Sequence, residues 1–182
     1  MIKTKYLVFA ITCIGFTAYS CGEKQTLSDD SPKVETNTPI DSPYTQTVTF
    51  PSEDGLVITA DEYHIDSTKP VIILCHQAGW SRGEYQEIAV TLNSLGFNCI
   101  ALDQRSGNAV NGVKNETAAK AKAEGKGQTF LDAEQDIRAA ITKYSAHYNQ
   151  NIILWGSSYS SSLALKIAAE NEKVSKVLSF SP

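Results

Sequence analysis

Short apolar runs alternate with helix-like segments from residue 71 onward, and the order of these elements decides the fold class. Three runs are short and apolar with polar residues at their ends, and a fourth ends the chain: 71–75, 97–102, 151–155 and 174–180. Consecutive apolar positions, as in the first three runs, indicate strands of a parallel sheet that is buried on both faces, and 174–180 is predicted to be a last strand. The segments between them have apolar residues at helical spacing. The sequence therefore predicts an α/β domain in which helices cover a mostly parallel sheet.

Two of the predicted helices have clear boundaries. The segment 84–95 is followed by Gly96, a residue that often ends a helix. The segment 129–148 begins with Thr129 and Asp132, which form a plausible capping pair. The predicted buried faces are Tyr85, Ile88, Ala89, Leu92 and Leu95 in the first helix, and Phe130, Ala133, Ile137, Ile141 and Tyr144 in the second.

The residues before position 71 have a different pattern. Thr45–Phe50 and Leu56–Ile65 alternate apolar and polar residues, which indicates an antiparallel pair of strands with one solvated face. The complete prediction is a doubly wound α/β fold with this hairpin at one edge of the sheet.

The N-terminus is predicted to lie outside the folded domain. The first five residues carry a net positive charge, and the apolar segment Tyr6–Ala18 follows them. This segment is too short to span a bilayer and is typical of a secretion signal. The stretch AYSC resembles a bacterial lipobox, which makes Cys21 the expected lipidation site; ordinary cleavage is the alternative. We expect a signal peptide over 1–20, a disordered polar tether over 21–44 and a hydrolase-like domain over 45–182, anchored at the cell envelope, in the outer membrane.

Composition and the positions of cysteine and histidine argue against nucleic-acid binding, a disulfide and a metal site. The formal net charge of −4 and the scattered lysines argue against a nucleic-acid-binding protein. Cys75 and Cys99 lie in apolar runs and are expected to be buried free thiols, because cysteines on paired strands rarely meet disulfide geometry. No histidine or further cysteine stands at ligand spacing, so we predict no metal site and no cofactor.

The stretch IILWGSSYSSSLAL, residues 152–165, places Ser158 between a predicted strand and a predicted helix. Small residues stand two positions before and after it, at Gly156 and Ser160. A strand–serine–helix turn with small neighbours is the context of a nucleophile elbow, in which the serine hydroxyl is lifted clear of the backbone. The alternative is that Ser158 only caps the helix, although Ser157 would serve equally well.

Three motifs together resemble the α/β-hydrolase superfamily, in particular its small esterase-like and serine-aminopeptidase-like members. GSSYS resembles the nucleophile elbow, HQAG at 76–79 the oxyanion loop after the third strand, and DQRSG at 103–107 the loop after the fourth. The resemblance extends from residue 45 to the C-terminus. Gln77 stands where many relatives have a second glycine.

The resemblance implies a role for each of these positions. Ser158 would be the nucleophile, and the backbone N–H of Tyr159 would be one oxyanion donor. Ala78 or Gln77 would supply the second donor. His76 is predicted to be a structural histidine that anchors its loop rather than a base. The other two histidines are expected away from Ser158, namely His64 in the hairpin and His147 at the far end of a helix. Asp103 and Arg105 could pair to brace their loop or could bind substrate.

The resemblance also implies that the catalytic acid and then the histidine follow the nucleophile, after a seventh and an eighth strand. The chain stops at the end of the expected sixth strand, so we interpret it as the N-terminal part of a longer hydrolase, containing strands 1–6 only. A truncated gene, a frameshift and a partial sequence remain alternatives. The predicted function is cleavage of an ester, thioester or small amide in a small-molecule or peptide substrate. The alternative is a non-catalytic envelope lipoprotein or an inactive remnant.

The long connection 107–128 is expected to line the site as a lid or a substrate wall. It leaves the sheet at the carboxyl end of a strand, where ligands bind in open α/β sheets, and it is longer than most connections. Its alanine and lysine content favours a marginal helix.

Overall fold

The computed structural model describes residues 41–181 of the chain. The predicted signal peptide, the lipidation site at Cys21 and the tether up to residue 40 lie outside the described residues. In the part of the chain that is described, no helix combines the length and the apolar character that a membrane span requires.

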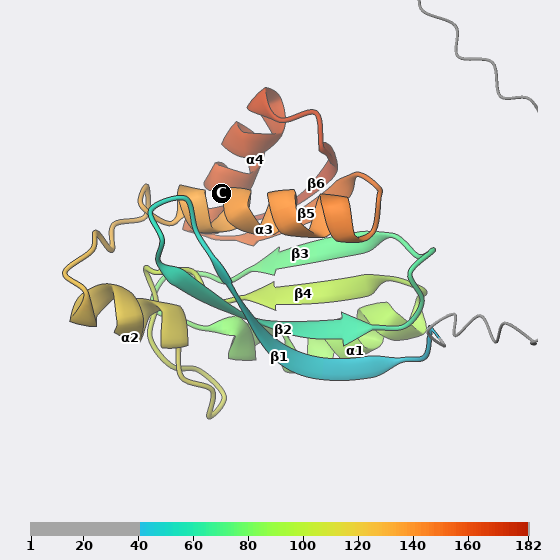
Figure 1. Ribbon diagram of the computed structural model, residues 1–182, viewed down its shortest axis with the longest axis horizontal. Coiled ribbons are helices and arrows are strands. Elements are labelled where there is room, and N and C mark those ends of the chain that lie inside the picture. The colour runs from blue at the N-terminus through green and yellow to red at the C-terminus, as the bar shows by residue number, and fades with distance from the viewer. Residues whose placement is uncertain (1–40, 182) are drawn as a thin grey trace, which may run out of the picture. The chain divides into compact units, whose positions relative to one another are not determined.

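The core of the domain is a six-stranded sheet with the order β1-β2-β4-β3-β5-β6 (Figure 1). The strands are β1 (Tyr44–Pro51), β2 (Val57–His64), β3 (Val71–Cys75), β4 (Asn98–Leu102), β5 (Ile152–Ser157) and β6 (Val174–Phe180). β2 pairs antiparallel with both β1 and β4, and β4, β3, β5 and β6 pair in parallel. The predicted mostly parallel sheet with a hairpin at one edge is thus confirmed.

Helices cover both faces of the sheet, as a doubly wound fold requires. They are the short 3₁₀ helix η1 (Arg82–Tyr85), α1 (Gln86–Ser94), α2 (Glu116–Ala123), α3 (Glu134–His147) and α4 (Tyr159–Glu170). α3 and α4 lie together on one face in Figure 1 and share one apolar cluster with residues of α2. η1 and α1 pack with Ile72 and Leu74 in a second cluster on the other face. Because side chains alternate along a strand, β3 contributes to both clusters.

The two cysteines of the domain are buried and free, which confirms the prediction made for them. Cys75 belongs to the cluster under α3 and α4, and Cys99 to the cluster under α1. Their side chains therefore lie on opposite faces of the sheet, which excludes a disulfide between them.

Two predictions about helix faces are wrong. Leu95 is 67% exposed because the chain turns away at Gly96, whose φ is +89°. Phe130 is 51% exposed, since α3 begins at Glu134 and not at Thr129. The predicted capping pair does form: Thr129 donates to the Asp132 carboxylate from its N–H and its hydroxyl at 2.7 Å. It stabilises the turn before α3 rather than the first turn of the helix.

The connection 107–128 contains α2 and a short β-bridge between Val110 and Val113. Asn115 caps α2 by accepting a hydrogen bond from the Ala118 N–H at 2.8 Å. α2 packs beside β2, and Thr117 on this helix accepts the Thr59 N–H at 2.9 Å. The connection therefore forms an ordered wall beside the carboxyl end of β4 (Figure 1).

Candidate active site

The three sequence motifs leave the sheet at one edge. In the parallel register, Cys75 at the end of β3 lies opposite Leu102 of β4 on one side and Gly156 of β5 on the other. The loops that follow these strands therefore start side by side. This edge is where open α/β sheets bind their ligands.

Ser158 occupies the sharp turn between β5 and α4. Its backbone has φ +55° and ψ −126°, a conformation that residues with a side chain rarely adopt and that costs about 1–3 kcal/mol. Its N–H donates to the Phe180 carbonyl at 2.9 Å, which ties the turn to the end of β6. The Ser158 side chain makes no capping hydrogen bond to α4. The hydroxyl is thus held in a strained turn without a capping role.

The small neighbours of Ser158 allow the turn to close. A Cβ atom at Gly156 would lie 2.5 Å from the Ser160 carbonyl oxygen and from the Ser161 Cα, so no larger residue fits there. Ser160 is fully buried, and its hydroxyl lies 2.7–2.8 Å from the carbonyl oxygens of Cys75, His76 and Ser157. Serine at this position therefore joins the elbow to the end of β3 through a polar contact.

Two backbone N–H groups at this edge are available for an anion. The N–H groups of Tyr159, at the start of α4, and of Ala78 make no hydrogen bond to a protein acceptor among residues 41–181. The start of α4 also carries the positive end of the helix dipole. The Gln77 N–H, in contrast, donates to the Glu84 carboxylate at 2.9 Å. Of the two predicted loop donors, Ala78 is the one whose N–H is free within the described residues.

His76 is fully buried and held by hydrogen bonds at both ring nitrogens. Its Nε2 accepts from the Gln104 N–H at 3.0 Å and lies 3.2 Å from the Asn115 side-chain nitrogen. Its Nδ1 therefore carries the proton and donates to the Gln77 carbonyl at 2.8 Å. Burial lowers the pKa of His76 to about 4, so the ring is neutral at pH 7.

The hydrogen bond from the His76 ring to the Gln77 carbonyl fixes the direction of the Ala78 N–H. The Gln77 carbonyl and the Ala78 N–H belong to one planar trans peptide and point in opposite directions. Because the His76 ring and the Trp80 N–H both donate to that carbonyl, at 2.8 and 3.3 Å, the opposite N–H is fixed as well. His76 thus holds the loop, and its Nε2 lone pair is not available to a substrate.

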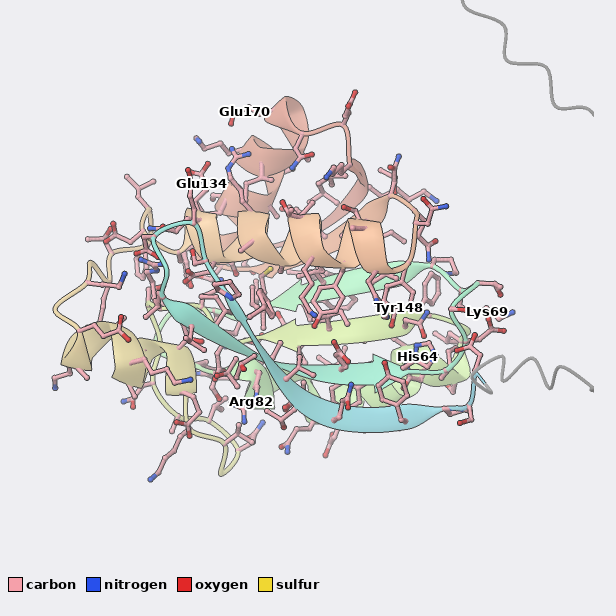
Figure 2. All side chains as sticks on the ribbon, in the orientation of Figure 1. His64, Lys69, Arg82, Glu134, Tyr148 and Glu170 are labelled. Carbon is pink, nitrogen blue, oxygen red and sulfur yellow. The ribbon has the colours of Figure 1, made fainter. Side chains whose placement is uncertain are left out.

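The other two histidines lie at the opposite edge of the sheet. His64 ends β2, which runs antiparallel to β4, and its ring lies between the Tyr148 hydroxyl at 3.0 Å and the Asp41 carboxylate at 2.6 Å (Figure 2). His147 ends α3, which returns from the edge that holds Ser158 to the start of β5. Neither histidine is near the elbow.

Asp103 and Arg105 do not pair with each other, so the predicted brace between them is wrong. Asp103 accepts hydrogen bonds from the Arg82 N–H at 2.8 Å and from the Arg82 guanidinium at 2.7 Å. Arg105 instead binds the carboxylates of Asp136 and Asp54, at 2.7 and 2.8 Å. Arg82 belongs to η1 on one face of the sheet and Asp136 to α3 on the other, so the two side chains bind partners on different sides.

The ion pairs of Arg105 with Asp136 and Asp54 have a structural role. Arg105 is 1% exposed and Asp136 is fully buried, and the Asp54 carboxylate completes the group from the β1–β2 turn. The guanidinium therefore joins three segments: the loop after β4, the start of α3 and the hairpin. None of these contacts reaches Ser158.

The side chain of Tyr159 anchors the start of α4. Its hydroxyl accepts from the Gln104 side-chain amide at 3.0 Å and from the Ser106 hydroxyl at 2.7 Å. The ring stacks on Phe130 with 4.4 Å between centroids. These contacts fix the residue whose N–H faces the proposed oxyanion position. Gln104 and Ser106 lie within DQRSG, so the motif itself was the sequence signal for them.

The described residues contain no cluster of His, Cys, Asp and Glu that could hold a metal ion. A cavity of about 580 Å³ lies between the β1–β2 turn and α3, lined by residues that include Phe50, Pro51 and Lys143. It is not lined by Ser158 and belongs to another part of the surface. A second cavity, of about 440 Å³, is lined by the connection 107–128 and includes Asn115 and Gln128.

Residues 66–182, more than half of the chain, match the family model described as serine aminopeptidase, S33. The chain belongs to this family. The match includes all three motifs, HQAG, DQRSG and GSSYS, and the structure brings these to one edge of the sheet. The resemblance to the α/β-hydrolases is therefore confirmed at the level of family and fold. None of the curated proteins matches the chain.

Several solved structures share the fold of this S33-family chain. A carboxyl esterase from Bacillus coagulans has a TM-score of 0.58 at 18% identity, with 73% of this chain and 43% of that chain covered. A dienelactone hydrolase from Anabaena variabilis has a TM-score of 0.58 at 17% identity, with 76% of this chain and 63% of that chain covered. An esterase from Pyrococcus furiosus has a TM-score of 0.58 at 19% identity, with 77% of this chain and 49% of that chain covered. The chain thus spans between about two fifths and two thirds of the length of these hydrolases.

Proposed function

We propose that the chain is the nucleophile-bearing part of a serine hydrolase that cleaves an ester, a thioester or a small amide. The observation that carries the proposal is the strained backbone of Ser158 at the end of the sheet where the Tyr159 and Ala78 N–H groups have no acceptor among residues 41–181. Such strain persists only where the surrounding structure enforces it, and it is typical of functional sites. A protein that only needed the fold would gain stability by relaxing this turn.

The proposed reaction is acyl transfer through Ser158. The Ser158 Oγ forms a bond to the substrate carbonyl carbon while its proton passes to a base. The carbonyl oxygen becomes an oxyanion, which the Tyr159 and Ala78 N–H groups stabilise. The leaving group departs with the proton from the base, and water then hydrolyses the acyl-enzyme.

The base and the acid that orients it are proposed to come from outside residues 1–182. The chain has three histidines. His76 is neutral with both nitrogens engaged, and His64 and His147 lie at the opposite edge of the sheet. This distribution supports a base from elsewhere in the active protein.

The test is hydrolysis of short-chain p-nitrophenyl esters by two proteins, residues 22–182 alone and the full product of the natural gene. We expect turnover from the full product and almost none from residues 22–182, because Ser158 there lacks a base. Ser158-dependent turnover by residues 22–182 would contradict the proposed origin of the base. Absence of turnover and of covalent labelling in both would favour a non-catalytic lipoprotein.

We also propose that the enzyme is held at the bacterial cell envelope, in the outer membrane, by a lipid on Cys21. The apolar segment Tyr6–Ala18 and the polar tether that follows Cys21 support this placement. In cells fed a labelled fatty acid, the natural protein should become labelled and the Cys21→Ser variant should not. Equal label in both proteins would rule out Cys21 as the lipidation site.

A further inference from the structure

The half-buried carboxylate of Glu84 lies beside the loop after β3, which carries one half of the proposed oxyanion site. Glu84 belongs to η1, on the face of the sheet opposite α3 and α4. Its Oε2 accepts the Gln77 N–H from the loop after β3 at 2.9 Å. Burial raises the pKa of this carboxylate, and Ser157, at the end of β5, acts to lower it. The Glu84 carboxylate thus binds the residue before Ala78.

We propose that Glu84 is a positioning residue that holds the loop after β3 so that the Ala78 N–H, and not the Gln77 N–H, is the oxyanion donor. The inference rests on the proposed function, since it concerns the geometry of the oxyanion site. Glu84 itself contacts neither the substrate nor the reacting atoms.

The argument begins with the peptides on either side of Gln77. The peptide that contains the Gln77 carbonyl is held by His76 and Trp80, as described above. The peptide that contains the Gln77 N–H is held on both sides, because Glu84 accepts the N–H at 2.9 Å and the Ser160 hydroxyl lies 2.7 Å from the His76 carbonyl. With both peptides held, the backbone at Gln77 has no remaining freedom to rotate the Ala78 N–H away from the site. Removing the carboxylate would leave the Gln77 N–H without an acceptor among the described residues and would weaken the hold on that peptide.

The second step concerns the choice of donor. The Gln77 N–H is the neighbour of the Ala78 N–H in the loop, and a free N–H there would rotate toward any nearby anion. Glu84 occupies it, so a substrate oxyanion meets the Ala78 N–H instead. Burial raises the pKa of Glu84, although the hydrogen bond from the Gln77 N–H acts against that rise.

The loop also has contacts that do not depend on Glu84. The Tyr85 hydroxyl donates to the Cys75 carbonyl at 2.7 Å, and the Ser160 hydroxyl lies 2.7 Å from the His76 carbonyl. These contacts hold the end of β3 in place. Loss of the Glu84 carboxylate should therefore disturb the direction of the donors and leave the fold intact.

The test compares variants of the full gene product in ester hydrolysis. Glu84→Leu is expected to lower kcat by about 10- to 100-fold with KM within about threefold, because loss of a single oxyanion donor costs about 10²–10³ in kcat. Glu84→Gln should restore kcat to within about threefold, since its carbonyl oxygen accepts the same N–H. Glu87→Leu, at an exposed position on α1, is the matched control and should leave both constants unchanged.

Two further readouts keep the outcomes distinct. If Glu84→Leu does not fold by circular dichroism, Glu84→Ala removes the same acceptor without a bulky side chain and should lower kcat by the same factor at unchanged KM. An unchanged kcat in the folded variants, or a Glu84→Gln variant as impaired as Glu84→Leu, would overturn the inference while the proposed function stands. If the natural protein has no Ser158-dependent turnover, the proposed function fails and the inference fails with it.

Discussion

Ser158→Ala is expected to lower ester turnover by the full gene product by at least about 10³-fold, because no other group can form the acyl-enzyme. The fold should survive the change. The Ser158 side chain makes no capping hydrogen bond, so its removal costs α4 no hydrogen bond at the cap. Residual activity through the free N–H groups of Tyr159 and Ala78 would remain above the uncatalysed rate.

The matched control is Ser162→Ala, an exposed serine on the same helix, which should retain full turnover. Initial rates on a p-nitrophenyl ester and a thermal unfolding curve for each variant separate lost chemistry from lost structure. If folded Ser158→Ala retains more than about a tenth of the natural rate, Ser158 is not the nucleophile.

Arg105→Met is expected to lower the free energy of unfolding by about 3–5 kcal/mol, the cost of leaving a buried charge without its partner. The Asp136 carboxylate, which is fully buried, would lose its contact to the guanidinium at 2.7 Å. Asp54, on the hairpin, would lose its contact at 2.8 Å as well. The variant is measured by urea unfolding of the full gene product at pH 7.

Two controls identify the buried pair as the cause. Lys126→Met removes a partly exposed cation 3.6 Å from Asp54 and should cost no more than about 1 kcal/mol. The double variant Arg105→Met with Asp136→Leu should recover part of the loss, because a buried pair replaced by apolar residues leaves no unpaired charge. A loss below about 1 kcal/mol for Arg105→Met alone would show that the network does not stabilise the domain.

The strands were the most predictable part of the fold. The bounds of β3 agree with the apolar run 71–75, since consecutive apolar residues mark a strand buried in the sheet. The bounds of β6 agree with the predicted last strand 174–180, although the residues of β6 are exposed or half-buried. The start of α3 was less predictable. The Thr129–Asp132 pair forms its hydrogen bonds, yet the helix begins only at Glu134, so a local capping signal did not determine the boundary.

The candidate site was predictable where it depends on strand ends and unpredictable where it depends on distant contacts. Ser158, His76 and Ala78 follow the ends of strands, and parallel pairing brings those ends together. Arg105 takes its partners from positions 51 and 31 residues away, which no local pattern indicates. The same applies to Glu84, whose contact to Gln77 depends on how η1 folds back beside the loop.

Covalent labelling of Ser158 by a fluorophosphonate tests the central proposal most directly. In this reaction the Ser158 Oγ forms a bond to phosphorus, the P–F bond breaks, and fluoride leaves. Intact-protein and peptide mass spectrometry of the full gene product should find one adduct per chain, on the peptide that contains Ser158, and none in Ser158→Ala. An unlabelled natural protein, or an adduct on another residue that persists in Ser158→Ala, would contradict the proposal.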